Sequence, residues 1–391
     1  MKREIAIGIA FMLIIPVVTA NNTNPSYFNR NGKTLYVGGD GPNNYTSIQD
    51  AINDANDGDT IFVCDDSSPY YENIIINKSI MLIGENKETT IINGGKRENT
   101  ITVVNNSFIC NFTIRESGDA CAGIGIESEY TIIKENIITD NDYAIYISNK
   151  NYITIIGNII YDNTLGLWVS NSHYNNISNN QFINDGLFIF NSYYNAIHNN
   201  TVNGNPLVYM EGKANREIAD KTGQIILIRC NNITIRDQEL SNTFFAIYLL
   251  YTNNSCIYQN NITNCKAGII LDKSNTNCIF HNNISRSEEE AIGLQFSNNN
   301  TITENNIFEN YIGVVSHSSY FNTINFNNIM KNFFQALLLY IYKDSWPFYN
   351  CWNENYWGKP KILPKPIFGF RFPLIWISFD WHPLRQPYKW W

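Results

Sequence analysis

The chain has 391 residues, of which 44% are hydrophobic and 16% are charged, and its formal net charge is −8. A chain this rich in apolar residues can bury enough surface to offset the entropy of ordering, which excludes intrinsic disorder. The negative charge argues against a nucleic acid as the main partner, because phosphate binding needs a basic surface. About one residue in six is Asn, and this excess requires a structural reason.

Residues 1–20 have the pattern of a signal peptide. Met1-Lys2-Arg3 gives a positive start, residues 5–18 form an apolar stretch, and Val18-Thr19-Ala20 supplies the small residues of a cleavage site. An uncleaved anchor is the alternative, although the stretch is short for a membrane span. No apolar run of 18 residues follows, so we expect no transmembrane segment after cleavage. We expect a secreted or cell-surface protein, and sequons such as Asn283-Ile284-Ser285 would then meet a glycosylation machinery.

Residues 21–95 are expected to form an N-terminal cap and the first coils of a repeat. Residues 34–37 and 60–63 have the composition of strands. Between them, residues 45–55 form a short amphipathic pattern that places Ile48 and Ile52 on one face of a helix. This helix is expected to cover the open end of the structure that follows.

A repeat of about 22 residues runs through residues 96–345. A column of amides recurs in steps of 20–23 residues, except for one step of 38, and an Ile stands three positions before every member. A further apolar residue stands two positions after every member. The column consists of Asn136, Asn158, Asn180, Asn200, Gln238, Asn260, Asn282, Asn305 and Asn327.

A period of this length fits few architectures. Helical repeats need long stretches with 3.6-residue periodicity, whereas these apolar runs are short, alternate by two and favour Ile and Val. A leucine-rich repeat would show Leu at its signature positions. The pattern therefore predicts an all-β fold, a parallel β-helix whose coils stack about 4.8 Å apart around an Ile core.

Stacked coils would also explain the Asn column. Asn tolerates the left-handed backbone of a sharp bend, and its amide can bond to the amides above and below it. We expect the column to form a hydrogen-bonded ladder at one corner of the solenoid. Gln238 departs from the column, which predicts a local irregularity in that coil.

Two regions depart from the repeat. Residues 203–223 account for the 38-residue step and are expected to form a charged insertion loop. Residues 346–391 are rich in Trp and Pro and are expected to form an irregular aromatic cap on the last coil. Because Trp rings pack against sugar rings, the cap also offers a candidate carbohydrate-binding surface. Its candidate residues are Trp352, Trp357 and Trp381.

The chain resembles right-handed parallel β-helix proteins of the NosD and carbohydrate-binding/sugar-hydrolysis type. The resemblance starts at Tyr45-Thr46-Ser47-Ile48-Gln49-Asp50-Ala51-Ile52 and Gly58-Asp59-Thr60-Ile61, and the 22-residue Asn and Ile repeats complete it. The ending Asn355-Tyr356-Trp357-Gly358 is similar to endings of exported archaeal members. The resemblance implies a pectate-lyase-like solenoid, but this architecture carries many functions.

One polar column offers candidate catalytic residues. Asp237, His281 and Glu304 each stand directly before a ladder position, on three of four consecutive coils. An Asp, a His and a Glu in one strip could perform acid–base chemistry or hold a cation. Other members of the same column, such as Phe326, favour the simpler interpretation of a polar bend.

The residues give little support to a metal cofactor. The copper binding implied by the NosD resemblance needs a cluster of soft or imidazole ligands, whereas the five His fall at different phases of the repeat. We therefore expect no cofactor. Cys256 and Cys278 have the same phase and are expected to be neighbours on adjacent coils, as stacked thiols rather than a disulfide.

Three functions remain open. The first is an exported β-helix protein that binds a polysaccharide or surface glycan, or serves as a structural module of the envelope. The second is a polysaccharide lyase or hydrolase that uses the Asp237–His281–Glu304 strip or residues 203–223. The third is a NosD-like accessory protein for the maturation of a copper enzyme.

Overall fold

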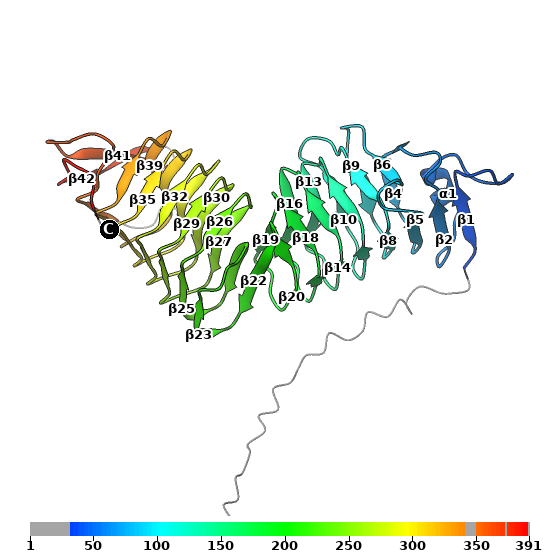
Figure 1. Cartoon of the computed structure of the whole chain (residues 1–391), viewed down its shortest axis with the longest axis horizontal. Helices are drawn as coiled ribbons and strands as arrows, with labels where there is room; N and C mark the ends of the chain where they lie inside the picture. The colour runs from blue at the N-terminus through cyan, green and yellow to red at the C-terminus, as the bar shows by residue number, and fades with distance from the viewer. Residues whose placement is uncertain (1–31, 341–348, 372–373, 390–391) are drawn as a thin grey trace, which may run out of the picture.

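A computed structural model describes residues 32–340, 349–371 and 374–389. In these residues the chain winds into a parallel β-helix, in which each coil contributes short strands to stacked walls (Figure 1). Ile257 pairs with Ile279, and Ile279 pairs with Ile302, so equivalent residues lie directly above one another. The predicted solenoid with about 22 residues per coil is confirmed. The signal peptide predicted at residues 1–20 lies outside the described residues.

The solenoid has two arms, and three parallel walls form the first arm. The first wall contains β1 (Thr34–Val37), β2 (Thr60–Val63), β5 (Met81–Gly84), β8 (Phe108–Cys110), β11 (Ile132–Lys134), β14 (Thr154–Ile156), β17 (Asn176–Ser178) and β20 (Ala196–His198). The second wall contains β3 (Tyr70–Tyr71), β6 (Ile91–Asn93), β9 (Thr113–Arg115), β12 (Ile137–Thr139), β15 (Ile159–Tyr161), β18 (Gln181–Ile183) and β21 (Thr201–Val202). The third wall contains β4 (Ile74–Ile76), β7 (Ile101–Val103), β10 (Ala122–Ile126), β13 (Tyr143–Ser148), β16 (Leu165–Ser170) and β19 (Leu187–Phe190).

Three walls also form the second arm. The first contains β23 (Ala214–Ile218), β25 (Asn231–Arg236), β28 (Cys256–Tyr258), β31 (Cys278–Phe280), β34 (Thr301–Thr303), β37 (Thr323–Asn325) and β40 (Cys351–Asn353). The second contains β26 (Glu239–Ser241), β29 (Asn261–Thr263), β32 (Asn283–Ser285), β35 (Asn306–Phe308) and β38 (Asn328–Met330). The third contains β22 (Asn205–Glu211), β24 (Gln224–Ile228), β27 (Phe245–Leu250), β30 (Ala267–Asp272), β33 (Glu290–Gln295), β36 (Ile312–His317) and β39 (Phe334–Tyr340).

The two arms meet at an angle near β19 and β22, which we call the vertex (Figure 1). The prediction of an insertion loop at residues 203–223 was wrong, because β22 and β23 in this segment pair in parallel with β24 and β25. Asn203 and Gly204 have φ of 50° and 77°, and they reverse the chain so that β22 lies antiparallel to β21. An Asn-Gly pair favours this tight hairpin turn.

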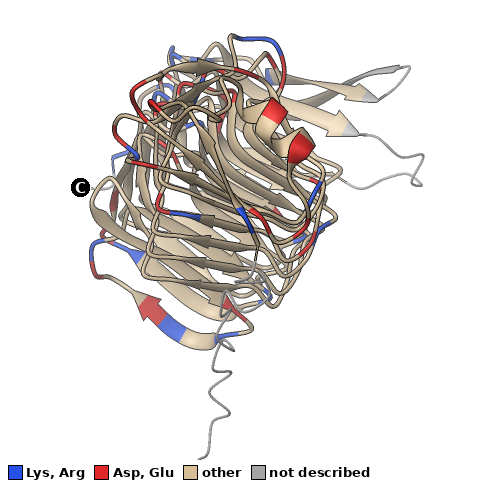
Figure 2. Ribbon diagram, turned by 90° about the vertical axis from the view of Figure 1, so that its right-hand side faces the viewer, with Lys and Arg blue, Asp and Glu red and all other residues tan. Residues whose placement is uncertain are grey.

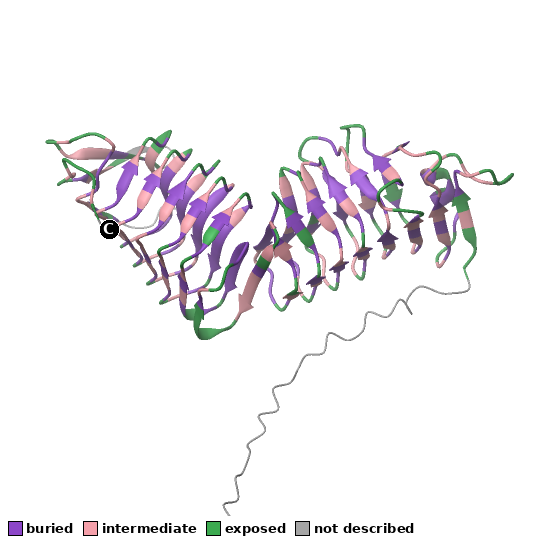
Figure 3. Ribbon diagram, viewed as in Figure 1, coloured by how far each residue is buried: buried purple, intermediate pink, exposed green. Residues whose placement is uncertain are grey.

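Alternation along each strand sends apolar side chains into the solenoid. In β13, Ala144, Ile145 and Ile147 are buried, whereas Tyr146 faces outward. Buried strand positions continue along both arms, with exposed residues mainly at the turns (Figure 3). The buried apolar residues form two core clusters, which divide near the vertex.

A short helix packs against the first coils of the solenoid, and a hairpin pairs with its last described strands. The helix α1 (Ile48–Asp54) begins at Ser47, whose hydroxyl accepts a hydrogen bond from the Asp50 amide, and Ile48 is fully buried. At the C-terminal end, β41 (Lys365–Arg371) and β42 (Leu374–Asp380) form an antiparallel hairpin next to β39. The aromatic cap is therefore more regular than its composition predicted.

The amides of the repeat column lie at one buried corner, where they bond from coil to coil. The Asn282 Nδ2 donates to the Asn305 Oδ1 at 3.0 Å, and the Asn260 Nδ2 donates to the Asn282 Oδ1 at 2.9 Å. Equivalent bonds between side-chain amides join the ladder residues of the first arm. In the second arm the ladder ends where the Asn355 Nδ2 donates to Asp380. Parallel ladders occupy other corners, for example from Asn277 to Asn300.

The explanation given for the Asn column needs a correction. The left-handed backbone lies one position earlier, where His281 and Glu304 have φ of 55° and 56°. The ladder positions instead need a side chain that can hydrogen-bond while buried. Asn282, for example, has no exposed surface, and buried polar groups need partners. Gln238 is also buried, and its Nε2 bonds to the carbonyl of Arg236 rather than to the next coil.

Candidate functional site

The proposed catalytic strip lies in the column of left-handed corner residues, and only two of its three members meet. The His281 Nε2 lies 2.5 Å from the Glu304 Oε2. The other Glu304 oxygen accepts the hydroxyl of Tyr388 at 2.8 Å, and this bond raises the pKa of the tyrosine. Both oxygens of the carboxylate are therefore engaged by protein groups.

Asp237 belongs to a different cluster. Its carboxylate pairs with the guanidinium of Arg236, which also contacts Glu217 at 2.5 Å. These two carboxylates raise the pKa of Arg236. One coil separates Asp237 from His281, and the Gln259 of that coil stands between them. The structure thus gives a His–Glu pair and a separate Arg–carboxylate cluster.

The predicted tryptophan surface is wrong for two of its three residues. Trp352 and Trp357 are only 2% and 5% exposed and belong to the core of the second arm. The Trp357 Nε1 donates to buried Asp380 at 2.9 Å. Only Trp381 is exposed, beside Phe379 with ring centres 5.1 Å apart. A buried ring cannot stack on a sugar, and the Trp-rich composition could not distinguish a core from a surface.

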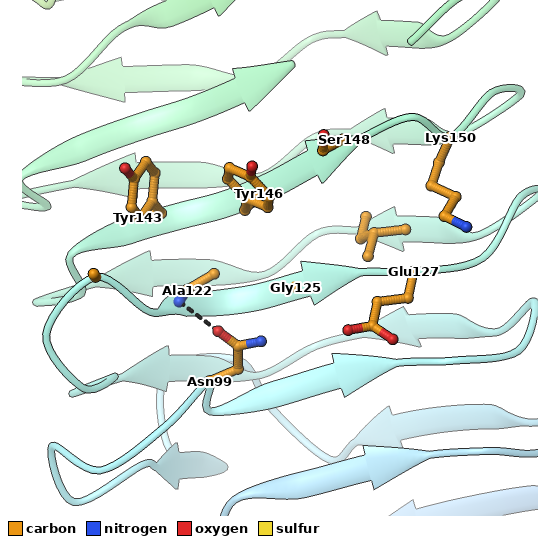
Figure 4. Close-up of a pocket in the computed structure, with 10 residues that line it drawn as sticks. Asn99, Ala122, Gly125, Glu127, Tyr143, Tyr146, Ser148 and Lys150 are labelled. Atoms are coloured by element: carbon orange, nitrogen blue, oxygen red, sulfur yellow. Dashed lines mark hydrogen bonds between the residues drawn. The ribbon is translucent and has the colours of Figure 1, made fainter. Parts of the chain in front are cut away.

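A pocket of about 370 Å³ lies on the outer face of the third wall in the first arm, and we call it the tyrosine pocket (Figure 4). Tyr146 projects outward from β13 and pairs in register with Gly125 of β10, which forms the floor. A Cβ at Gly125 would lie 2.5 Å from the Asn99 Nδ2, so glycine leaves the space open. Tyr143 stands at the start of β13, with its ring centre 5.4 Å from that of Tyr146.

Polar groups surround the two rings. Asn99 is fixed by a 2.7 Å hydrogen bond from the Ala122 amide to its Oδ1. Glu127 and Lys150 lie at the opposite end of the pocket from Tyr143 (Figure 4). Burial raises the pKa of Tyr143, so its hydroxyl remains a neutral donor and acceptor. The pocket therefore combines aromatic surface with hydrogen-bonding groups of both kinds.

An aromatic strip leads from the tyrosine pocket to the vertex. The Trp168 ring stands perpendicular to Tyr143 at 5.9 Å and contacts Phe188 at 4.3 Å between centres. Phe188 in turn lies 5.4 Å from Phe244 of the second arm. Sequence reasoning missed this strip, although a signal was present: Tyr146, Trp168 and Phe188 occupy one outward position on successive coils.

Charged residues of both signs lie close together on the described part of the chain. Acidic and basic residues are interspersed along the turns and rims of the coils (Figure 2). Across residues 32–340, 349–371 and 374–389, no three His, Cys, Asp or Glu residues are grouped in a way that could hold a metal ion. In the same ranges, no helix has the length and apolarity needed to cross a membrane. Cys256 and Cys278 pair in register as free thiols.

The fold and the sequence together define a right-handed parallel β-helix. A family model described as a right handed beta helix region matches residues 97–222, and the NosD model, described as a periplasmic copper-binding protein, matches residues 208–361. The chain is a β-helix repeat protein of the NosD type. A comparison with curated proteins gives no match.

Solved structures with a similar fold include three proteins that can be compared with this chain. XylC in complex with xylose is 11% identical, with a TM-score of 0.35 and 89% of each chain covered. A pectin methylesterase from carrot is 15% identical, with a TM-score of 0.34 and 64% of this chain and 82% of that chain covered. The A-module of the Azotobacter vinelandii mannuronan C-5 epimerase AlgE6 is 14% identical, with a TM-score of 0.30 and coverage of 80% and 81%. At these identities the likeness concerns the fold alone.

Proposed function

We propose that the chain is an extracytoplasmic glycan-binding protein and that the tyrosine pocket holds the sugar rings. The observation that carries the proposal is that Tyr143, Tyr146, Asn99 and Lys150 all line one open pocket. Tyr rings supply flat apolar surface with little loss of side-chain entropy, and the polar groups can bond to hydroxyls. The 38% exposure of Tyr146 leaves its ring accessible to a ligand.

The position of the pocket suits an extended ligand. Gly125 and Tyr146 lie on stacked strands of a long wall, so a chain of sugars could run along the solenoid and meet successive coils. The aromatic strip through Trp168 continues the same outward position toward the vertex. We infer that a polysaccharide, rather than a single sugar, is the ligand of this face.

Binding to immobilised polysaccharides tests the proposal. Acidic and neutral polysaccharides are compared for retention of the full chain, and the affinity for the retained one is measured by calorimetry. Tyr146→Ala is expected to weaken binding roughly ten-fold or more, since hot-spot aromatic residues dominate such contacts. Tyr71→Ala is the matched control, because Tyr71 is 71% exposed and lies outside the pocket. Equal affinity of the two variants would contradict the proposal.

The extracytoplasmic location rests on two observations. The NosD family model is described as periplasmic, and residues 1–20 have the pattern of an export signal. Expression in a secreting host followed by N-terminal sequencing tests this part. A mature chain that begins near residue 21 supports export, whereas a chain that retains Met1 in the cytoplasm refutes it.

The hydrolase or lyase alternative is supported by one contact, the 2.5 Å approach of His281 to Glu304. A His–carboxylate pair is a common arrangement for proton transfer. Release of reducing ends from a bound polysaccharide, lost in both Glu304→Gln and His281→Gln, would establish catalysis by this pair. Copper-enzyme maturation has no comparable support, because the described residues contain no cluster of metal ligands.

A further inference from the structure

A second, more polar pocket of about 200 Å³ lies at the vertex, and we call it the vertex pocket. Its first side is the corner between β18 and β19, which carries Asn184 and Asp185. Its second side is the corner between β26 and β27, which carries Asn242 and Thr243. Both arms therefore contribute to the pocket at the point where the solenoid bends (Figure 1).

Asp185 ends a corner ladder whose earlier members are Asn141 and Asn163. It is only 3% exposed, and both of its hydrogen bonds, from the amide and the Nδ2 of Asn163, reach the Oδ2. Among the described residues, nothing donates to the Oδ1. Burial raises the pKa of Asp185 to about 7, against the lowering effect of the Asn163 bonds. An Asn would continue the ladder without this penalty, so the ladder itself does not require a carboxylate here.

Asp380 also ends a ladder, but it differs from Asp185 because both of its carboxylate oxygens accept hydrogen bonds. Its Oδ2 accepts from the amide and the Nδ2 of Asn355 and from the Trp357 Nε1, and its Oδ1 accepts from the His382 amide. Asp380 is therefore explained by its protein partners. Asp185 keeps one unused oxygen beside a pocket.

Thr243 lines the same pocket and carries a second unsatisfied group. The residue is 4% exposed, and its Oγ1 is buried without a hydrogen-bond partner. A Cβ at Gly186 would lie 2.6 Å from this Oγ1, so glycine leaves room around the hydroxyl. Buried hydroxyls are normally paired, and an unpaired one beside a pocket indicates a missing partner.

The rim of the vertex pocket carries balanced charge. The Lys266 Nζ lies 3.4 Å from the Glu288 Oε2, and both residues line the pocket. The ammonium of Lys266 is paired with Glu288, and among the described residues no three potential metal ligands are grouped here, so nothing indicates a metal site. An anion would be opposed by the carboxylates of Asp185 and Glu288. The arrangement favours a neutral group that can both donate and accept hydrogen bonds.

We propose that the vertex pocket binds a small neutral ligand rich in hydroxyl groups, which donates one hydroxyl to the Asp185 Oδ1 and bonds a second to the Thr243 Oγ1. The side-chain amides of Asn184 and Asn242 supply further donors and acceptors at the corners. The site is separate from the tyrosine pocket and does not depend on glycan binding there.

Calorimetry on the full chain at pH 8.5 tests the site. The probes are glucose, galactose, mannose, xylose and glycerol, with calcium chloride and sodium glucuronate as separate ionic probes. At least one neutral probe is expected to bind, with an affinity roughly ten- to hundred-fold lower in Asp185→Asn and Thr243→Val. Ser287→Ala is the matched control, because the Ser287 Oγ is also buried without a partner but does not line the pocket.

The outcomes separate this site from the tyrosine pocket. Binding that is weakened by Asp185→Asn and kept in Tyr146→Ala supports the vertex site, whatever the fate of the proposed function. Binding lost only in Tyr146→Ala supports the tyrosine pocket and overturns the vertex site. The absence of binding by any neutral probe, or an Asp185-dependent response to an ionic probe alone, overturns it too. Thermal unfolding of each variant shows that the fold is retained.

Discussion

The side-chain amide of Gln224 bonds to the backbone of Leu187 across the vertex, in the way that the backbone of a neighbouring strand would. Its Oε1 accepts the Leu187 amide at 3.0 Å, and its Nε2 donates to the Leu187 carbonyl at 2.9 Å. The same Nε2 donates to the Phe245 carbonyl at 2.9 Å. One buried side chain therefore satisfies the strand edges of both arms at the place where the coils part, because β19 has no following strand in its sheet.

Gln224→Leu is expected to destabilise the protein by roughly 2–5 kcal/mol, because it leaves one buried amide and two carbonyls unpaired. Urea unfolding followed by far-ultraviolet circular dichroism measures the change. Gln181→Ala serves as the control, since Gln181 is exposed on β18 and its replacement should stay within about 0.5 kcal/mol. Matching urea midpoints for the two variants would show that the hydrogen bonds of Gln224 to Leu187 and Phe245 do not stabilise the protein.

Asn282→Ala tests the buried ladder. The Asn282 Oδ1 accepts from the backbone amide and the Nδ2 of Asn260, and its own Nδ2 donates to the Ile257 carbonyl and to Asn305. We expect a loss of roughly 1–3 kcal/mol, mainly from the groups left unpaired on the adjacent coils. Asn283→Ala removes a partly exposed amide from the outer face, and its effect should be smaller in the same urea titration. An unchanged midpoint for Asn282→Ala would count against the ladder.

The sequence predicted the solenoid well because its signal is repeated on every coil. Ile257, Ile279 and Ile302 share one phase, and stacking is the only arrangement that buries them all in one column. The vertex was harder, because it depends on a single Asn203-Gly204 turn. That dipeptide is a hairpin signal, but a 38-residue spacing alone cannot distinguish a loop from an added coil.

The candidate site was predicted poorly for a related reason. Residue type identified Asp237, His281 and Glu304, but spacing gives only which coil a residue occupies and not where its side chain points. The ion pair of Asp237 with the adjacent Arg236 depends on side-chain orientation, and the hydrogen bond of Glu304 with Tyr388 comes from a segment outside the repeat. The tyrosine pocket lies at outward positions of the repeat, so a search of the outward phase would have found it.

Two tryptophans of the C-terminal cap are expected to differ sharply in their effect on stability. Trp352→Ala should destabilise the protein by roughly 3–5 kcal/mol, because it empties a buried position in the second core. Trp381→Ala should change stability by less than about 0.5 kcal/mol, because the ring is 61% exposed. Thermal and urea unfolding of both variants provide the measurement. A large loss for Trp381→Ala would contradict the surface position of that ring.

Asp185 is expected to make stability depend on pH in an unusual direction. Its pKa of about 7 in the folded protein lies above the ordinary 3.8, so the folded state holds a proton that the unfolded state has already released. The contribution of this proton to the free energy of unfolding is fully present below about pH 4, and it is lost as the pH rises through 7. Asp185→Asn removes this dependence, because an amide does not titrate and continues the pattern of Asn163.

Comparing the stability of the parent and of Asp185→Asn across pH isolates the effect of the Asp185 carboxyl from that of all other titrating groups. Asp185→Asn should match the parent near pH 4 and exceed it by roughly 2–4 kcal/mol at pH 8, since each unit of pKa difference corresponds to about 1.4 kcal/mol. Urea unfolding at intervals between pH 4 and 8.5 gives both curves. Asp220→Asn is the control for the substitution itself, because Asp220 is exposed and is not among the groups that shift the pKa of Asp185. Parallel curves for Asp185→Asn would mean that this carboxyl is ionised throughout, and that the pocket around it already solvates the charge.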